Sequence, residues 1–374
     1  MNTLEPMSFW AGKKAFSKIM DSGLSAGDIK VVAGAAGGPK WLVLNALDRA
    51  MFSRWIKNRE KPLFLIGSSI GSWRFAAAAC RDPQSAIDRF ESAYIKQSYR
   101  KNPPPEDIDR ELESVLDALM GHEGTEHILS HPFLRLNIMT VRCKGLTKPD
   151  DKKRLVPGFA IAGLLNAASR RSLGLFFERT LFYDQRDLPP FFDMAGFPIK
   201  RVPLDIQNLK PALLASGSVP MLMSGIKDIP GAPAGIYRDG GLLDYHININ
   251  FLSSGRDKND IVLFPHYAEK LVPGWLDKQV PWRRPDFSCM ENVLMIAPGR
   301  EFIKSLPLEK IPDRKDFYLF AGRDKDRMDY WRKVVERSRE LAEDFMEAVE
   351  TGKIRSRLQP IEKLNKKPRT RGGR

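Results

Sequence analysis

Short apolar runs alternate with segments of helical periodicity along most of this sequence, and the alternation restricts the fold more than any other feature. The apolar runs are predicted to be buried strands and lie at 30–33, 62–66, 133–143, 176–184 and 260–266. Segments with apolar residues at helical spacing begin near Pro39, Ile70, Gln84, Ile108 and Leu209. Strands that alternate with helices favour a mostly parallel sheet covered on both faces. We therefore expect an α/β fold, arranged as a three-layer α/β/α sandwich.

The chain of 374 residues divides into four predicted parts. Residues 1–28 are expected to form a helical lead-in and residues 29–325 the main domain. An amphipathic helix is predicted over 326–352, ending at a glycine. The remaining segment, 353–374, holds nine Lys/Arg against a single glutamate and so carries +8 of the chain's net charge of +14. We expect this basic tail to be disordered and to promote contact with anionic membranes.

Composition excludes several classes of protein. The three cysteines, Cys80, Cys143 and Cys289, are far apart and form no CxxC pair, so neither a disulfide framework nor a structural zinc site is expected. The N-terminus lacks the apolar stretch of a secretory signal, and no window approaches the ~18 apolar residues of a membrane span. We expect a cytoplasmic protein, with at most peripheral membrane contact.

The segment "GSSIG" at 67–71 follows an apolar run and precedes a helix-like segment rich in alanine. It fits G-x-S-x-G only with Ser69 at the centre, between Gly67 and Gly71, because Ser68 and Ser72 are out of register. This motif lifts a nucleophilic serine out of a sheet on a strained turn. The competing interpretation is an ordinary turn between a strand and a helix.

The segment "GAAGGPKW" at 34–41 is a second glycine-rich turn before a helix. A phosphate-binding P-loop would end in G-K-[ST], whereas this one ends in Pro39, Lys40 and Trp41. The alternative is a loop whose amides stabilise a developing oxyanion, with Gly37, Gly38 and Lys40 as donors, since proline has no N–H. A tight turn required by packing would give the same pattern.

A third motif, "YRDGG" at 237–241, places Asp239 after a short predicted strand and before Gly240 and Gly241. Two glycines after an aspartate make a sharp turn. The same placement brings Asp239 to the sheet edge where Ser69 is expected, and a buried carboxylate with a raised pKa can act as a base.

Taken together, the three motifs resemble the patatin-like phospholipase family, which has a glycine-rich oxyanion loop, a G-x-S-x-G turn and a later D-G-[GA] motif. They occur here in that order at 36–40, 67–71 and 239–241. The resemblance implies Ser69 as nucleophile and Asp239 as base of a Ser–Asp dyad, acting on a phospholipid or other lipid ester. It implies no metal or organic cofactor.

The sequence departs from the family pattern at three places. Ala36 replaces the first glycine of the loop, and Trp41 replaces a further glycine, which would narrow or line the acyl site. After Asp239 the sequence reads "GGLLDYHININ" where the family usually has Asn-x-Pro, which places His246 seven residues after Asp239. A Ser–Asp–His triad in the chain order of α/β-hydrolases is therefore an alternative to the dyad. His266, in "FPHY", is a weaker catalytic candidate than His246, and His122, His127 and His131 show no metal-ligand spacing.

Two other functions stay open from the sequence alone. An acyltransferase would use the same site with an alcohol in place of water. A membrane- or nucleic-acid-binding protein led by the basic tail would retain only a vestigial site, although the tail lacks the aromatic residues that stack on bases, so no specific nucleic acid is expected.

Overall fold

The computed structural model describes residues 5–122, 124–253 and 260–364. Within them, eleven strands form one sheet with the order β11-β1-β10-β9-β2-β3-β4-β5-β6, and β8 and β7 branch from β4. The strands are β1 Met7–Ala11, β2 Ile29–Gly34, β3 Leu63–Ser68, β4 Leu134–Cys143, β5 Phe177–Tyr183, β6 Ile199–Pro203, β7 Ile226–Lys227, β8 Ile236–Asp239, β9 Ile261–Pro265, β10 Val293–Pro298 and β11 Leu358–Pro360.

The centre of the sheet is parallel. β10, β9, β2, β3 and β4 pair parallel in that order, and every residue of β3 and β9 is buried. β5 and β8 both pair antiparallel to β4, so the sheet is mixed on that side. The predicted α/β fold with a mostly parallel sheet is confirmed, and the carboxyl ends of β2 and β3 meet at one edge.

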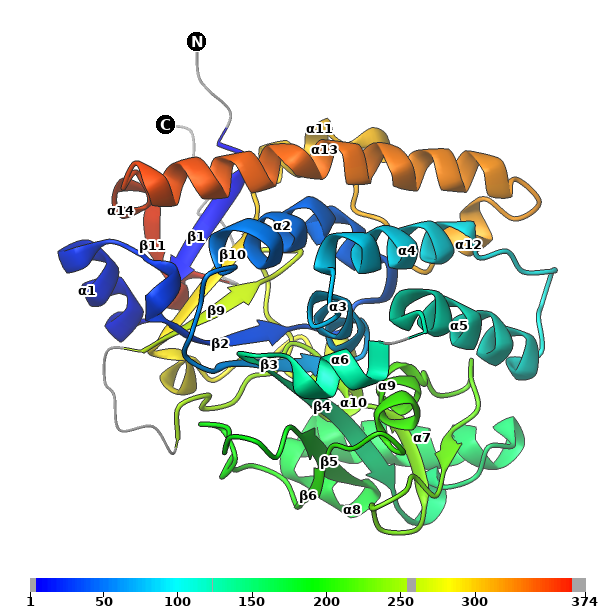
Figure 1. The fold of residues 1–374 in the computed structure, drawn as a ribbon. Helices are drawn as coiled ribbons and strands as arrows, with labels where there is room; N and C mark the ends of the chain where they lie inside the picture. Colours follow the sequence, from blue (N-terminus) through cyan, green and yellow to red (C-terminus); the bar gives the residue numbers. More distant parts are fainter. Residues whose placement is uncertain (1–4, 123, 254–259, 365–374) are drawn as a thin grey trace, which may run out of the picture.

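Helices flank this sheet. α3 packs on β2, β3 and β4, while α2 and α4 lie between the sheet and the long α13 (Figure 1). The helices are α1 Lys13–Ser22, α2 Asn45–Ala50, α3 Ile70–Ala78, α4 Pro83–Lys96, α5 Pro105–Met120, α6 Gly124–Ser130, α7 Lys152–Ala168, α8 Leu173–Phe176, α9 Leu209–Gly217, α10 Gly241–Asp244, α11 Arg300–Ser305, α12 Asp316–Leu319, α13 Asp324–Glu350 and α14 Ile354–Arg357. Among the described residues, none of the helices combines the length and apolarity that a membrane crossing needs.

The predicted helical lead-in is wrong at its start. Residues 7–11 form β1, which pairs antiparallel with β10 and parallel with β11. The segment "MSFWA" is apolar, and Phe9 is fully buried in the sheet. Only α1 matches the expectation of a helix before residue 28.

The C-terminal region corrects a second expectation. α13 confirms the predicted amphipathic helix, and its apolar side buries Trp331 and Phe345. Residues 353–364, predicted to be disordered, instead form α14, β11 and a short turn, with Ile354 and Ile361 fully buried. The other predicted tail residues, 365–374, lie outside the described part of the chain.

Candidate active site

Ser69 connects the end of β3 to the first turn of α3, with φ 56° and ψ −129°. Such a conformation costs a non-glycine residue about 1–3 kcal/mol and persists only where the surroundings enforce it. They do so here, because a Cβ on Gly67 would lie 2.4 Å from the Ser72 nitrogen and one on Gly71 would lie 2.1 Å from the Gly34 oxygen. The turn therefore presents Ser69 at the carboxyl edge of the sheet.

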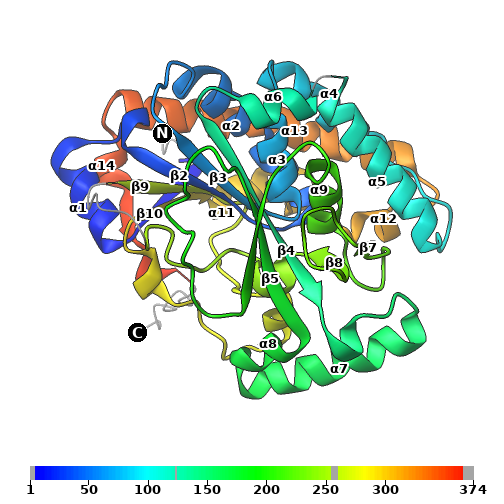
Figure 2. The same cartoon turned by 60° about the horizontal axis from the view of Figure 1, so that its bottom comes forward.

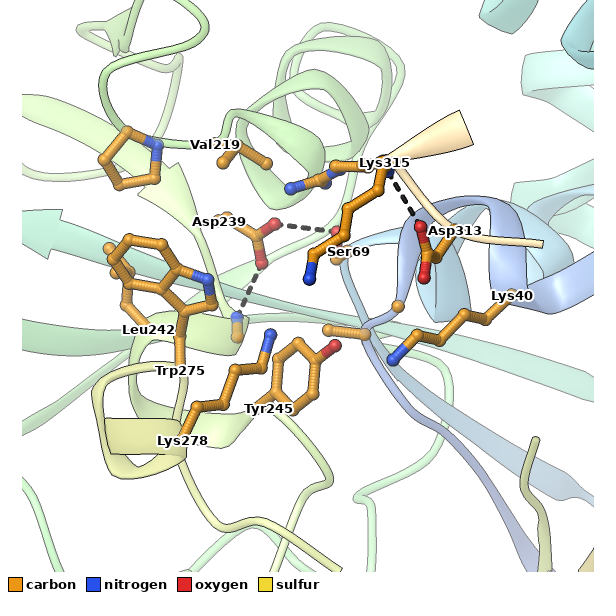
Figure 3. Close-up of a pocket in the computed structure, with 15 residues that line it drawn as sticks. Lys40, Ser69, Val219, Asp239, Leu242, Tyr245, Trp275, Lys278, Asp313 and Lys315 are labelled. Carbon is orange, nitrogen blue, oxygen red and sulfur yellow. Dashed lines mark hydrogen bonds between the residues drawn. The ribbon is translucent and has the colours of Figure 1, made fainter. Parts of the chain in front are cut away.

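The sheet topology brings Asp239 to this serine across 170 residues of sequence. β8 pairs with β4 so that Asp239 lies opposite Thr140, and Ser68 of β3 lies opposite Met139. Ser69 Oγ donates to Asp239 Oδ2 at 2.7 Å, and the Gly241 amide donates to Oδ1 at 2.7 Å (Figure 3). These two bonds fix the carboxylate beside the hydroxyl.

The pKa of Asp239 is raised above its ordinary value because the carboxylate is buried. Arg314 and the hydrogen bonds from Ser69 and Gly241 oppose this shift without cancelling it. A raised pKa makes the carboxylate a stronger base than an exposed aspartate, as proton transfer from a serine hydroxyl requires.

Ser216, in α9, also belongs to this site, although no sequence motif marks it. The Ser69 amide donates to Ser216 Oγ at 2.9 Å, and Ser216 Oγ donates to the Met139 oxygen at 2.7 Å. Ser72 Oγ lies 3.0 Å from the same hydroxyl. Ser216 thus ties the strained turn to β4, and the only sequence signal was the run of small residues in α9.

The glycine-rich loop after β2 leads into a short 3-10 helix, Gly38–Leu44. Gly38 has φ +57°, and a Cβ on Gly37 would lie 2.6 Å from the Tyr267 ring, so neither position accepts a side chain easily. The first N–H groups of a helix have no acceptor inside it, which leaves the Gly37 and Gly38 amides available at this terminus. Gly37 and the Lys40 side chain line the same pocket as Ser69, whereas Gly38 packs against Arg314.

This pocket has a volume of about 200 Å³ and is lined by four basic and two acidic side chains. Burial and the nearby Lys40 and Arg314 lower the pKa of Lys278 to about 7, and burial lowers the pKa of Lys40. Of these cations only Lys40 belongs to a sequence motif, since Lys278 lies in the short 3-10 helix Leu276–Gln279 and Arg314 and Lys315 lie in a turn. The lining residues are Ala36, Gly37, Lys40, Ser69, Val219, Pro220, Asp239, Gly241, Leu242, Tyr245, Trp275, Lys278, Asp313, Arg314 and Lys315 (Figure 3).

His246 lies outside the Ser–Asp pair. Its Nδ1 accepts from the Val272 amide at 2.9 Å, which leaves Nε2–H to donate to Tyr267 Oη at 2.7 Å. Tyr267 Oη in turn donates to the Ala36 oxygen at 2.7 Å. Burial, His266 and Lys40 hold the pKa of His246 well below its ordinary value, so the ring is neutral. The histidine therefore stabilises the glycine-rich loop through Tyr267.

Trp41 also has a structural place. It is 1% exposed and stacks on Phe90 with ring centroids 4.3 Å apart, so it belongs to the core. The expectation that Trp41 lines the pocket is therefore wrong.

His131 has a structural role, because it accepts backbone N–H bonds from 133 and 134. Within the described part of the chain, no group of His, Cys, Asp and Glu side chains could hold a metal ion.

Comparison with known proteins gives little further information. No family model matches the sequence, and no curated protein is similar to it. Among solved structures, the crystal structure of VipD from Legionella pneumophila aligns with a TM-score of 0.31 and 14% sequence identity. The alignment covers 64% of this chain and 50% of VipD. A similarity at this level does not bear on function, which has to be inferred from the geometry of the site.

Proposed function

We propose that this protein is a serine hydrolase of lipid esters that works through an acyl-serine intermediate and a Ser–Asp dyad. The observation that carries the proposal is the strained Ser69, whose Oγ donates at 2.7 Å to the buried carboxylate of Asp239. A strained strand-to-helix turn and a hydroxyl bonded to a base are the two features that activate a serine nucleophile.

In the acylation step Ser69 Oγ attacks the ester carbonyl carbon while Asp239 accepts the hydroxyl proton. The carbonyl oxygen becomes an oxyanion, for which the Gly37 and Gly38 amides at the start of the 3-10 helix are the proposed donors. Each well-placed donor of this kind contributes about 3 kcal/mol to transition-state stability. Asp239 then returns the proton to the departing alcohol as the ester bond breaks.

Deacylation repeats the sequence with water. Asp239 takes a proton from the attacking water, and the second oxyanion occupies the same amides. When Ser69 leaves, it recovers the proton, so the fatty acid is released and the dyad is regenerated. The bond between the Gly241 amide and Oδ1 holds the carboxylate in place during both steps.

The cationic pocket favours esters that carry a negative group, such as phospholipids. Lys40, Lys278, Arg314 and Lys315 line it against only two carboxylates, including that of Asp239. Its volume of about 200 Å³ lies below the ~300 Å³ of typical small-molecule sites. It therefore fits an ester group and its anionic neighbour, while long acyl chains extend beyond it.

The test compares Ser69→Ala with Ser68→Ala on a soluble short-chain ester and on phosphatidylglycerol. Ser68 Oγ is buried without a hydrogen-bond partner among the described residues, so its removal disturbs no polar contact. Ser69→Ala should lose hydrolysis by a factor of about 10³ or more, and Ser68→Ala should retain it. A folded Ser69→Ala protein with most of the activity would overturn the proposal.

A further inference from the structure

The outer face of α7 is apolar and open to solvent. Its exposed positions recur at helical spacing, and Leu164 is 73% exposed. Figure 2 shows α7 at the outer edge of the molecule. Exposed apolar side chains of this extent mark an interaction site. The exposed residues of this face are Val156, Pro157, Ala160, Ile161, Leu164, Leu165 and Ala168.

The opposite face of α7 holds the helix firmly on the protein. Leu155, Phe159 and Ala162 are buried in a hydrophobic cluster with residues of β4 and β5. At Gly158 the helix approaches the turn before it so closely that a Cβ would lie 2.2 Å from the Leu146 oxygen. The exposed apolar face therefore belongs to a well-packed helix. Leu146, at 54% exposed, adds to the apolar surface beside it.

Cations stand at both ends of this face. The exposed Lys152, Lys153 and Arg154 begin α7 and the exposed Arg171 follows it, whereas Arg170 is paired with Asp277. The sequence from 152 to 177 contains no aspartate or glutamate. Because the other face of α7 packs on the protein, its exposed apolar side chains would gain by insertion into the interface of a membrane, and the nearby cations by attraction to anionic phosphates.

α7 is also connected to the wall of the catalytic pocket. Asn166 Nδ2 and Arg170 Nε each donate to the Asp277 carboxylate at 2.9 Å. The Phe159 ring packs on that of Trp275 with centroids 6.4 Å apart. Trp275 and Lys278, on either side of Asp277, both line the pocket.

We propose that the outer face of α7 binds the surface of an anionic lipid bilayer, with its apolar side chains inserted and its terminal cations on the phosphates. A second copy of the chain fits less well, because isologous pairing of two such helices would bring their basic ends together, and of the two acidic residues beside them Asp150 is already paired with Arg238. Binding by α7 is separate from hydrolysis at Ser69. Only its purpose, to bring the pocket to lipid, rests on the proposed function.

The experiment measures co-sedimentation of the full-length chain with vesicles of phosphatidylcholine alone or mixed with phosphatidylglycerol. Ser69→Ala is present throughout, so that hydrolysis does not alter the vesicles and binding is measured whether or not the proposed function holds. Leu164→Glu is the test variant. Leu188→Glu is the matched control, since Leu188 is 63% exposed and follows Asp187, which pairs with Arg135 at the other end of β4 from α7.

We expect the parent chain to bind the mixed vesicles. Leu164→Glu should bind them at least about tenfold more weakly, because one leucine loses its burial and a negative charge is added. Leu188→Glu should bind like the parent. Lys152→Glu with Lys153→Glu should weaken binding to mixed vesicles and leave the weaker binding to phosphatidylcholine unchanged.

Two results would overturn the proposal. One is equal vesicle binding by the parent and Leu164→Glu, which would leave a surface other than α7, such as residues 365–374, as the membrane contact. The other is an absence of vesicle binding by the parent chain. If the parent chain is then a dimer in solution that Leu164→Glu dissociates, a second copy of the chain is the partner of α7.

Discussion

Replacement of Asp239 by asparagine should remove the base and leave the site otherwise intact. Oδ1 accepts from the Gly241 amide and Oδ2 from Ser69 Oγ, both at 2.7 Å. An asparagine of the same shape keeps the first bond through its carbonyl oxygen, but its amide group donates toward Ser69 and cannot accept the hydroxyl proton. The nucleophile then has no group to activate it.

The size of the effect follows from the role of the base. A positioned general base contributes a factor of about 10²–10⁴, so kcat for Asp239→Asn should fall by about 10³, or ~4 kcal/mol in the activation barrier. Stability should move the other way. The folded-state pKa of Asp239 is raised, so its carboxylate disfavours folding as pH rises through that pKa. Its removal should leave Tm unchanged or higher at neutral pH.

The assay is hydrolysis of a soluble short-chain ester between pH 5 and 9, with Tm measured on each variant. Wild-type activity should decline as pH falls through the raised pKa of Asp239, because protonation removes the base. Asp313→Asn, which changes another carboxylate of the same pocket, should stay within about tenfold of wild type. The reasoning is refuted if Asp239→Asn does the same, or if His246→Gln loses as much activity as Asp239→Asn.

Three further outcomes are expected. Ser216→Ala should lower kcat by about tenfold and stability by about 1–3 kcal/mol, because the buried Ser69 amide loses its acceptor; unchanged kcat and Tm would contradict this. In the wild type, KM for an anionic ester should rise above about pH 7 as Lys278 loses its charge, and Lys278→Met should abolish that dependence; a pH-independent wild-type KM would count against the headgroup role. A chain that ends at 352 should unfold at a lower temperature than one that ends at 364, since Ile354 and Ile361 are buried; equal Tm values would show that their packing adds nothing.

The sequence was sufficient for features that depend on neighbouring residues. Apolar runs bounded by turns predicted the strands at the centre of the sheet, because burial on both faces leaves an uninterrupted apolar signal. The turns at Ser69 and Asp239 were predictable from the glycines next to them in the sequence. We expected both motifs to lie at one edge of the sheet, and the 2.7 Å hydrogen bond between Ser69 and Asp239 agrees with that expectation.

Features that depend on distant contacts were not predictable. β11 is an edge strand and β1 is its inner neighbour, and these two short segments become strands only through their pairing with each other and with β10. Ser216 and Lys278 reach the site from α9 and from the short 3-10 helix Leu276–Gln279, and no catalytic motif in their local sequence marks them. α7 is apolar on both its buried and its exposed faces, so it lacks the amphipathic period by which a surface helix is recognised.

The most direct test of the account is labelling of the folded protein with a fluorophosphonate, followed by identification of the modified peptide by mass spectrometry. Activated serines react with this probe, whereas ordinary buried hydroxyls do not. The account predicts a single adduct on Ser69, absent from Ser69→Ala and strongly reduced in Asp239→Asn. An adduct on Ser68, Ser72 or Ser216, or no adduct on the folded wild-type protein, would contradict it.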